Sequence, residues 1–150
     1  MNIVFKRGNI FDDKAEAIVN PVNCVGVMGA GLALEFKSRF PDNYNLYRRA
    51  CLNNELEIGK CFITQCSGNN NPEYIVNFPT KLHYRHLSKL EYIIAGLTDL
   101  VIRLKQREVK SVAIPAIGCG LGGLKWELVL EEIIKAFNST DFIIHIYKPY

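Results

Sequence analysis

Two glycine-rich segments have the residue types and spacing that most directly indicate chemistry. The first glycine loop covers residues 26–31 (GVMGAG), the second glycine loop covers residues 118–123 (GCGLGG), and each precedes a predicted helix. Glycine lets the backbone turn through positive φ and come close to a ligand. Free N–H groups at the start of a helix, together with the helix dipole, favour an anion. The pair of loops indicates a diphosphate held from both sides, whereas either loop alone fits an ordinary turn equally well.

The common nucleotide-binding signatures do not account for these loops. The sequence contains no GxxxxGK[ST] motif, which argues against a P-loop ATPase. The second glycine loop does match GxGxxG, but a Rossmann site also needs an acidic residue at the far end of the next strand. Here Asp141 precedes that strand, and the printed sequence ends soon after it. We therefore reject a Rossmann site.

A lysine followed by aromatic and basic residues forms the third chemical feature. Lys81 follows a predicted strand, where its side chain can stabilise developing charge or, as a neutral amine, attack a sugar carbon. His83, Tyr84 and Arg85 fit either contact with a substrate or an ordinary surface. The histidines have no further ligands grouped with them, and the five cysteines contain no CxxC pair, so we predict no metal site and no disulfide framework.

Strands and helices alternate along the chain. Apolar and β-branched runs predict strands at residues 3–6, 17–19, 61–64, 74–77, 112–114 and 142–147. Apolar residues at helical spacing predict helices at residues 32–40, 42–51, 90–104 and 126–137. This alternation predicts an α/β fold with a mixed, mostly parallel sheet of about six strands and helices on both faces. Ligands of such sheets bind at the carboxyl ends of the strands, so the loops and Lys81 should meet there.

Local signals add detail to these elements. Residues 20–23 (NPVN) predict a polar turn that ends the second strand, and Pro79 predicts a turn after the fourth. Ser88 and Glu91 predict a capping box, in which each side chain satisfies a free backbone N–H of the first turn of the long helix. The apolar stripe of that helix is predicted to comprise Leu90, Ile94, Leu97, Val101 and Leu104.

Bulk properties are those of a single globular domain over residues 1–150. Hydrophobic residues make up 49% of the chain, which is long enough to bury a core without disulfides. Lys and Arg number 18 against 15 Asp and Glu, and a net charge of +3 tolerates a polyanionic partner without requiring one. With no run of about 20 apolar residues and no secretory signal pattern, we expect a cytoplasmic monomer without membrane contact.

Four motifs in order resemble a macrodomain along the whole chain. They are Gly8-Asn9-Ile10, Ala17-Ile18-Val19-Asn20-Pro21-Val22-Asn23, Gly29-Ala30-Gly31-Leu32-Ala33 and Pro115-Ala116-Ile117-Gly118-Cys119-Gly120. Within macrodomains the chain resembles the terminal ADP-ribose glycohydrolase branch. In that branch it is most similar to DarG-type antitoxins, which remove ADP-ribose from thymidine in DNA. Residues 25–29, 77–85 and 120–126 carry this finer resemblance.

The resemblance implies a role for each motif. Asn9 and Ile10 would meet the adenine edge, Asn20 and Asn23 would lie beside the distal ribose, and Lys81 would be catalytic. The remaining expected ADP-ribose contacts are Gly29, Ala30, Gly31, Leu32, Ala33, Thr80, Ile117, Gly118, Cys119, Gly120, Leu121 and Gly122. No cofactor is implied beyond ADP-ribose as ligand or product. The implied partners are ADP-ribosylated DNA or protein and a cognate ADP-ribosyltransferase toxin.

Two departures from the macrodomain pattern bear on the activity. Many macrodomains have an acidic residue at the position of Asn9, where it accepts a hydrogen bond from adenine; an asparagine oxygen accepts without charge assistance. Gly122 stands where the protein-directed glycohydrolase has a catalytic acid, and the DNA-directed antitoxin lacks that acid too. The second departure favours ADP-ribosylated thymidine in DNA over protein glutamate or aspartate as the substrate.

Three activities fit these residues. We expect hydrolysis of an ADP-ribosyl glycosidic bond. The alternatives are a non-catalytic ADP-ribose reader and a deacetylase of O-acetyl-ADP-ribose, both on the same fold. Lys81 separates hydrolase from reader, because a protein that only binds ADP-ribose has no use for a nucleophile at the distal ribose.

Overall fold

One sheet organises the molecule. The computed structural model describes residues 1–68 and 71–149, and in this part of the chain six strands lie in the spatial order β1-β6-β5-β2-β4-β3. All neighbouring strands are parallel except β3, which runs antiparallel to β4. The bounds are β1 Asn2–Lys6, β2 Ala17–Asn23, β3 Phe62–Gln65, β4 Tyr74–Lys81, β5 Ser111–Ile114 and β6 Ile143–Tyr147. The predicted mixed, mostly parallel sheet is confirmed.

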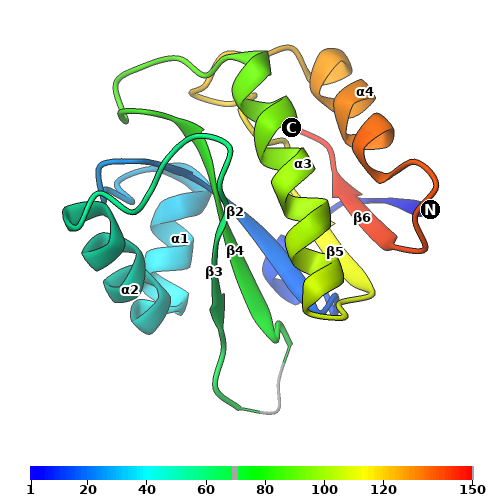
Figure 1. Ribbon diagram of the computed structural model, residues 1–150, viewed down its shortest axis with the longest axis horizontal. Helices are drawn as coiled ribbons and strands as arrows, with labels where there is room; N and C mark the ends of the chain where they lie inside the picture. The colour runs from blue at the N-terminus through cyan, green and yellow to red at the C-terminus, as the bar shows by residue number, and fades with distance from the viewer. Residues whose placement is uncertain (69–70, 150) are drawn as a thin grey trace.

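Helices cover both faces of this sheet, as predicted. Figure 1 shows α3 and α4 on one face, with α1 and α2 on the other. The bounds are α1 Gly31–Arg39, α2 Pro41–Leu52, α3 Leu90–Gln106 and α4 Trp126–Phe137, with a 3₁₀ turn η1 at Ile10–Asp12. None of the helices in the described residues has the length and apolar character needed to cross a bilayer.

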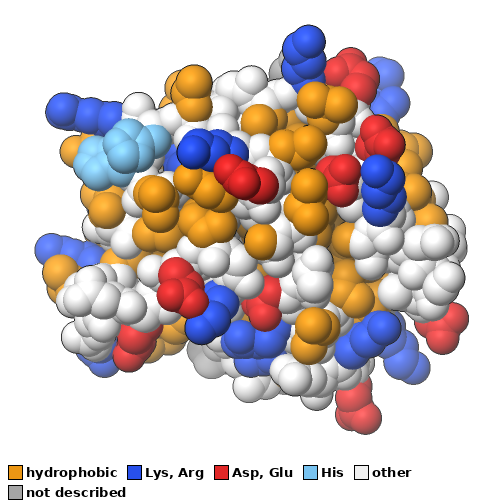
Figure 2. Space-filling view, turned by 45° about the horizontal axis from the view of Figure 1, so that its top comes forward, with side chains coloured by type: hydrophobic (Ala, Val, Ile, Leu, Met, Phe, Trp, Pro, Cys, Tyr) orange, Lys and Arg blue, Asp and Glu red, His pale blue; other side chains and the backbone are white. Residues whose placement is uncertain are grey.

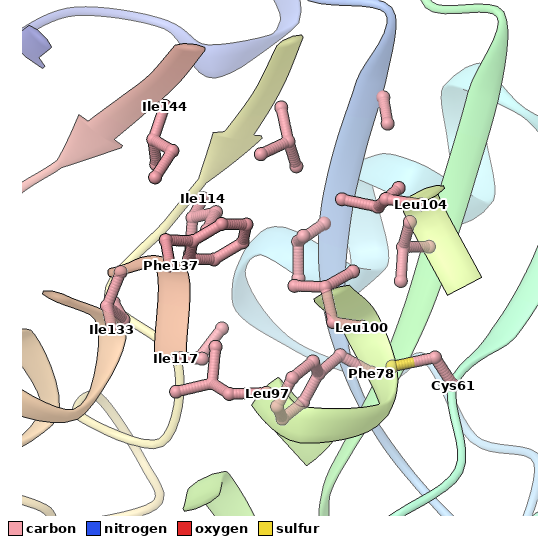
Figure 3. Close-up of a cluster of buried hydrophobic side chains, with 14 of the residues drawn as sticks. Cys61, Phe78, Leu97, Leu100, Leu104, Ile114, Ile117, Ile133, Phe137 and Ile144 are labelled. Carbon is pink, nitrogen blue, oxygen red and sulfur yellow. The ribbon is translucent and has the colours of Figure 1, made fainter. Parts of the chain in front are cut away.

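The larger core cluster lies between the sheet, α3 and α4. Leu97, Leu100 and Leu104 of α3 belong to this cluster, and Leu97 and Leu100 lie close to Phe78 of β4 (Figure 3). Gly96 permits this approach, because a Cβ atom there would clash with the Phe78 ring. The predicted stripe was partly wrong. Ile94 is 42% exposed, and the buried apolar face of the helix instead comprises Ile93, Leu97, Leu100 and Leu104.

The two central strands run further than the sequence predicted. Turns were expected at residues 20–23 and at Pro79, but β2 continues to Asn23 and β4 to Lys81. Pro21 pairs with Phe78, and Val22 pairs with Pro79, before the register shifts between Val22 and Asn23. Proline usually leaves a central strand because it lacks an N–H donor. Here the mutual pairing of the two strands outweighs the local turn preference.

The start of α3 is also different from the prediction. The helix begins at Leu90, Lys89 occupies the N-cap position, and no side chain caps the helix. The capping box of Ser88 and Glu91 was therefore wrong. The Ser88 hydroxyl donates instead to the backbone carbonyl of Thr80, so a tertiary contact replaces the local one.

A buried carboxylate connects η1 to the ends of β1 and β6. Asp13 lies 2.6 Å from the Tyr147 hydroxyl, 2.9 Å from Nδ1 of His145 and 3.3 Å from Nζ of Lys6, and it accepts the Ala15 N–H at 2.7 Å. Burial alone would raise the pKa of Asp13. The hydrogen bonds from Tyr147, His145 and the Ala15 amide outweigh burial, with the positive charge of His145 adding to them, and they hold the pKa below its ordinary value.

Asp13→Asn should lower the free energy of unfolding at neutral pH by about 2 kcal/mol, because it removes a charge that several donors satisfy. The lowered pKa means that the wild-type carboxylate stabilises the fold fully above the ordinary value of 3.8. That contribution is lost as the pH falls through the lower folded-state value. Urea unfolding of both proteins between pH 7 and pH 2 should show the difference shrinking with acid. A difference independent of pH would contradict this account of Asp13.

Candidate active site

A large cavity opens at the carboxyl ends of β2, β4, β5 and β6. Its volume is about 1700 Å³, which exceeds the roughly 300–1,000 Å³ of a typical small-molecule pocket. Residues that line it come from segments 6–11, 21–23, 27–35, 80–84, 115–122 and 147–149, although some residues within these segments do not face the cavity. Both glycine loops and Lys81 therefore meet at one place, as expected for a ligand site in a parallel sheet.

The second glycine loop has a backbone that leaves no room for a side chain at Gly122. A Cβ atom there would lie 2.5 Å from the carbonyl oxygen of Gly118. The backbone of Gly118 has a φ of +76°, in the left-handed region. Leu124 donates its N–H to this same carbonyl at 2.9 Å, which closes the loop. A Cβ at Gly120 would meet no protein atom within 4 Å, and Gly120 lines the cavity. In this conformation position 122 has no room for the side chain of an acidic residue.

The first glycine loop is held by Asn23 at the end of β2. The Asn23 side chain accepts the N–H of Val25 at 3.1 Å and donates to the carbonyl of Val27 at 2.7 Å. The buried Tyr47 of α2 donates to the Asn23 carbonyl at 2.7 Å. Gly31, with a φ of +56°, then begins α1. Sequence reasoning did not find Tyr47, because its link to Asn23 exists only once α2 packs on the sheet.

Lys81 is the last residue of β4 and lines the cavity. Its Nζ donates to the backbone carbonyl of Tyr84 at 3.2 Å, and neighbouring Thr80 donates through its hydroxyl to the Val22 carbonyl at 3.3 Å. Among the described residues that line the cavity, Glu35 of α1 is the only one with a carboxylate. Lys81 therefore lines the same cavity as the two glycine loops, and neither loop carries a carboxylate.

The end of the cavity near β1 and β6 has apolar, aromatic and basic residues in its lining. Ile10, Phe11 and Tyr147 line it together with Asn9. The Asn9 side-chain oxygen accepts the Phe11 N–H at 2.9 Å and so caps η1. That oxygen was expected to serve the adenine amino group, and it already has one partner. Sequence reasoning missed several residues here, although the rule that ligands lie at strand ends points to them: Lys6, Arg7, Phe11, Tyr147 and Lys148.

A stacked group of side chains lies next to Lys81. The rings of His83 and Tyr84 are 4.2 Å apart and nearly parallel, and the Arg85 guanidinium lies 5.7 Å from the Tyr84 ring. Tyr84 is 43% exposed and lines the cavity, whereas His83 and Arg85 lie outside its lining. Figure 2, in which the top of Figure 1 comes forward, shows histidine side chains near basic and apolar ones at one corner of this face.

Two of the expected ligand contacts are not at the cavity. Asn20 and Ile117 are both 0% exposed and are absent from the lining. Asn20 lies within the sheet layer, where its amide donates to the Asn77 side chain at 3.2 Å, and Ile117 packs in the core. The structure therefore does not place either residue at the cavity, and their contact with ADP-ribose stays a prediction. The other expected contacts line the cavity: Asn9, Ile10, Asn23, Gly29, Ala30, Gly31, Leu32, Ala33, Thr80, Lys81, Gly118, Cys119, Gly120, Leu121 and Gly122.

Neither a thiolate nor a metal cluster is found at this site. Burial, with nearby Glu127 adding to it, raises the pKa of the Cys119 thiol to about 11, so the thiol stays protonated at neutral pH. Over residues 1–68 and 71–149, no three His, Cys, Asp or Glu side chains are grouped so that they could hold a metal ion. Three lysines line the cavity, Lys6, Lys81 and Lys148, and Lys81 is the one at the end of β4, paired with Asn23 of β2.

The fold and this cavity define the class of protein. Residues 19–133 match the model of the Macro domain family, and the chain belongs to this family. It is 45% identical over 146 residues to the DNA ADP-ribosyl glycohydrolase of Thermus aquaticus, covering 97% of this chain and 41% of that protein. The macrodomain of Mycobacterium tuberculosis DarG superposes with a TM-score of 0.97 at 44% identity, covering 99% of this chain and 98% of the other.

A third relative joins two activities in its name. A DNA ADP-ribosyl transferase–DNA ADP-ribosyl glycohydrolase fusion protein of Thermosipho africanus is 34% identical over 163 residues, covering 99% of this chain and 42% of that protein. A structure of Thermosipho africanus DarTG in complex with ADP-ribose superposes with a TM-score of 0.92 at 35% identity, covering 99% of this chain and 42% of the other. The chain spans 41% and 42% of the length of these two curated relatives.

Proposed function

We propose that this chain is an ADP-ribosyl glycohydrolase that binds ADP-ribose in the cavity and cleaves it from thymidine in DNA. The observation that carries the proposal is the position of Lys81. This residue lines the same cavity as the two glycine loops, at the carboxyl end of the sheet. The names of the Thermus and Thermosipho relatives support the choice of DNA. We also propose a cognate DNA ADP-ribosyltransferase as partner, because the Thermosipho protein joins both activities.

In this proposal the ligand lies along the cavity in three parts. The adenine lies between Ile10, Phe11 and Tyr147, with Asn9 at its edge. The diphosphate lies between the two glycine loops, whose backbone N–H groups and following helices favour an anion. The distal ribose then lies by Asn23 and Lys81, which are paired across β2 and β4.

Lys81 can act on the distal ribose by either of two routes. As an ammonium group it stabilises charge that develops as the glycosidic bond breaks. As a neutral amine it attacks the anomeric carbon while the bonding electron pair leaves with the thymine base, which takes up the proton that the alkylated nitrogen loses. Water then hydrolyses the resulting sugar–lysine adduct, which releases ADP-ribose and restores the amine. Neither route needs a carboxylate at position 122, where the backbone excludes one.

A release assay on three substrates tests the proposed function directly. ADP-ribosylated thymidine DNA, ADP-ribosyl-glutamate protein and O-acetyl-ADP-ribose are incubated in parallel with the protein, and free ADP-ribose is quantified by chromatography. We expect release to be fastest from DNA. Faster release from either of the other substrates would overturn the choice of DNA. Tight binding of ADP-ribose without release from any substrate would instead support the reader.

Tyr84→Ala should slow release from ADP-ribosylated DNA about tenfold, because a base stacked on an aromatic ring contributes roughly 1–3 kcal/mol. Tyr84→Phe keeps the ring and should cleave DNA at close to the wild-type rate. Affinity for free ADP-ribose, measured by calorimetry, should change little in both variants. Equal cleavage of DNA by the alanine and phenylalanine variants would argue against a stacking role.

A further inference from the structure

Ser88 lies between the two parts of the site that must act together. It is 7% exposed and occupies the connection from β4 to α3. Its hydroxyl donates to the carbonyl of Thr80, directly before Lys81. Its backbone N–H donates to the carbonyl of Gly122, in the second glycine loop, at 2.9 Å. One buried residue thus bonds both to the strand end that presents the lysine and to the loop proposed to hold the diphosphate.

The surroundings of Ser88 restrict the whole connection, which we call the lysine loop (residues 81–88). A Cβ atom at Gly118 would lie 3.2 Å from the Ser88 hydroxyl, and one at Gly123 would lie 3.2 Å from the Leu87 side chain. The lysine loop therefore packs directly on the second glycine loop. At its other end, the Lys81 amine bonds to the Tyr84 carbonyl within the same loop. The Ser88 hydroxyl closes the lysine loop by bonding to Thr80, the residue directly before it.

We propose that Ser88 is a positioning residue for hydrolysis. This proposal rests on the proposed function of Lys81. Its hydroxyl sets where the end of β4 lies relative to the second glycine loop, and hence where the amine lies relative to a bound diphosphate and its distal ribose. A displacement of about 1 Å between reacting groups can slow a reaction by roughly 100-fold. The diphosphate itself contacts backbone groups that the hydroxyl does not supply, so affinity for ADP-ribose does not depend on it.

Ser88→Ala should therefore slow release from the best substrate at least tenfold, with the Kd for free ADP-ribose within threefold of wild type. Ser111→Ala is the matched control. The Ser111 hydroxyl accepts the Glu16 N–H at 2.9 Å at the start of β5, the strand end opposite to the cavity. This control loses one comparable hydrogen bond and should keep both rate and affinity. If Ser88→Ala does not fold, Ser88→Cys is the second variant, because it has a side chain of similar shape with a weaker hydrogen-bond donor. It should slow release less than the alanine variant is expected to, and the Kd for ADP-ribose should again be unchanged.

A second readout needs no turnover. Amine-selective labelling followed by mass spectrometry compares Lys81 with exposed Lys89, which serves as an internal reference. In the presence of ADP-ribose, the ratio of Lys81 to Lys89 labelling should be at least threefold higher in Ser88→Ala than in the wild type, because the amine is no longer held against the ligand. Ser111→Ala should leave this ratio unchanged.

The outcomes separate the two proposals. Release by Ser88→Ala within twofold of wild type, an unchanged labelling ratio, or a loss of ADP-ribose affinity equal to the loss of rate would each overturn the role of Ser88. Absence of release by the wild-type protein from all three substrates would contradict the proposed function. In that case the labelling ratio still decides whether Ser88 positions the amine.

Discussion

Lys81→Ala should lower the rate of ADP-ribose release by about 1,000-fold or more while leaving the Kd for free ADP-ribose nearly unchanged. The rate falls because the amine is the reactive side chain proposed to lie at the distal ribose, and groups that act only in the transition state change the rate without changing binding. Affinity persists because backbone groups of the two glycine loops are proposed to hold the diphosphate. Single-turnover release and calorimetry on the same preparation measure the two quantities.

Two further variants allow the result for Lys81→Ala to be interpreted. Lys89→Ala removes an exposed lysine at the N-cap of α3 and should keep wild-type activity. Lys81→Arg keeps a positive charge but removes the nucleophilic amine, so it should retain a measurable part of the activity only if the role is electrostatic.

Reduction of the reacting wild-type enzyme should trap a sugar on Lys81 if the amine attacks. If the alanine variant hydrolyses the best substrate at a near wild-type rate, the catalytic role of Lys81 is wrong and the reader becomes the better proposal.

Gly120→Val should weaken ADP-ribose binding at least 100-fold without unfolding the protein. A Cβ atom at Gly120 meets no protein atom within 4 Å, so the added side chain occupies the space proposed for the diphosphate rather than the core. Its effect should therefore appear in calorimetry and hardly at all in the melting temperature measured without ligand. Gly120→Ala adds less volume and should give an intermediate loss of affinity.

Gly122→Ala provides the contrast within the same loop. Its Cβ would lie 2.5 Å from the Gly118 carbonyl oxygen, so even a methyl group forces the backbone to move. This variant should lower the melting temperature without ligand, whereas Gly120→Val should not. Wild-type affinity in a folded Gly120→Val variant would show that the second glycine loop is only a turn. Any ADP-ribose binding would then have to come from the other residues of the cavity.

The sequence predicted the elements whose pattern is local. Periodic apolar residues identified the strands and helices, and the alternation of these elements implied the mostly parallel sheet. Glycines before helices and Lys81 after a strand then had to meet, because parallel strands place their carboxyl ends at one edge. These features depend on residue type and spacing along the chain, so they could be inferred without knowing which segments pack together.

Only the tertiary structure decided how polar residues of ambiguous type are used. Ser88 has the signature of an N-cap, yet its hydroxyl bonds to Thr80, because β4 extends through Pro79 and brings that carbonyl within reach. Asn20 has the signature of a turn or a ligand contact, yet pairing of β2 with β4 buries it against Asn77. A short polar side chain can satisfy its hydrogen bonds locally or across the fold with similar free energy. Packing of distant segments decides which of these partners is used, and the spacing of residues along the chain does not reveal that packing.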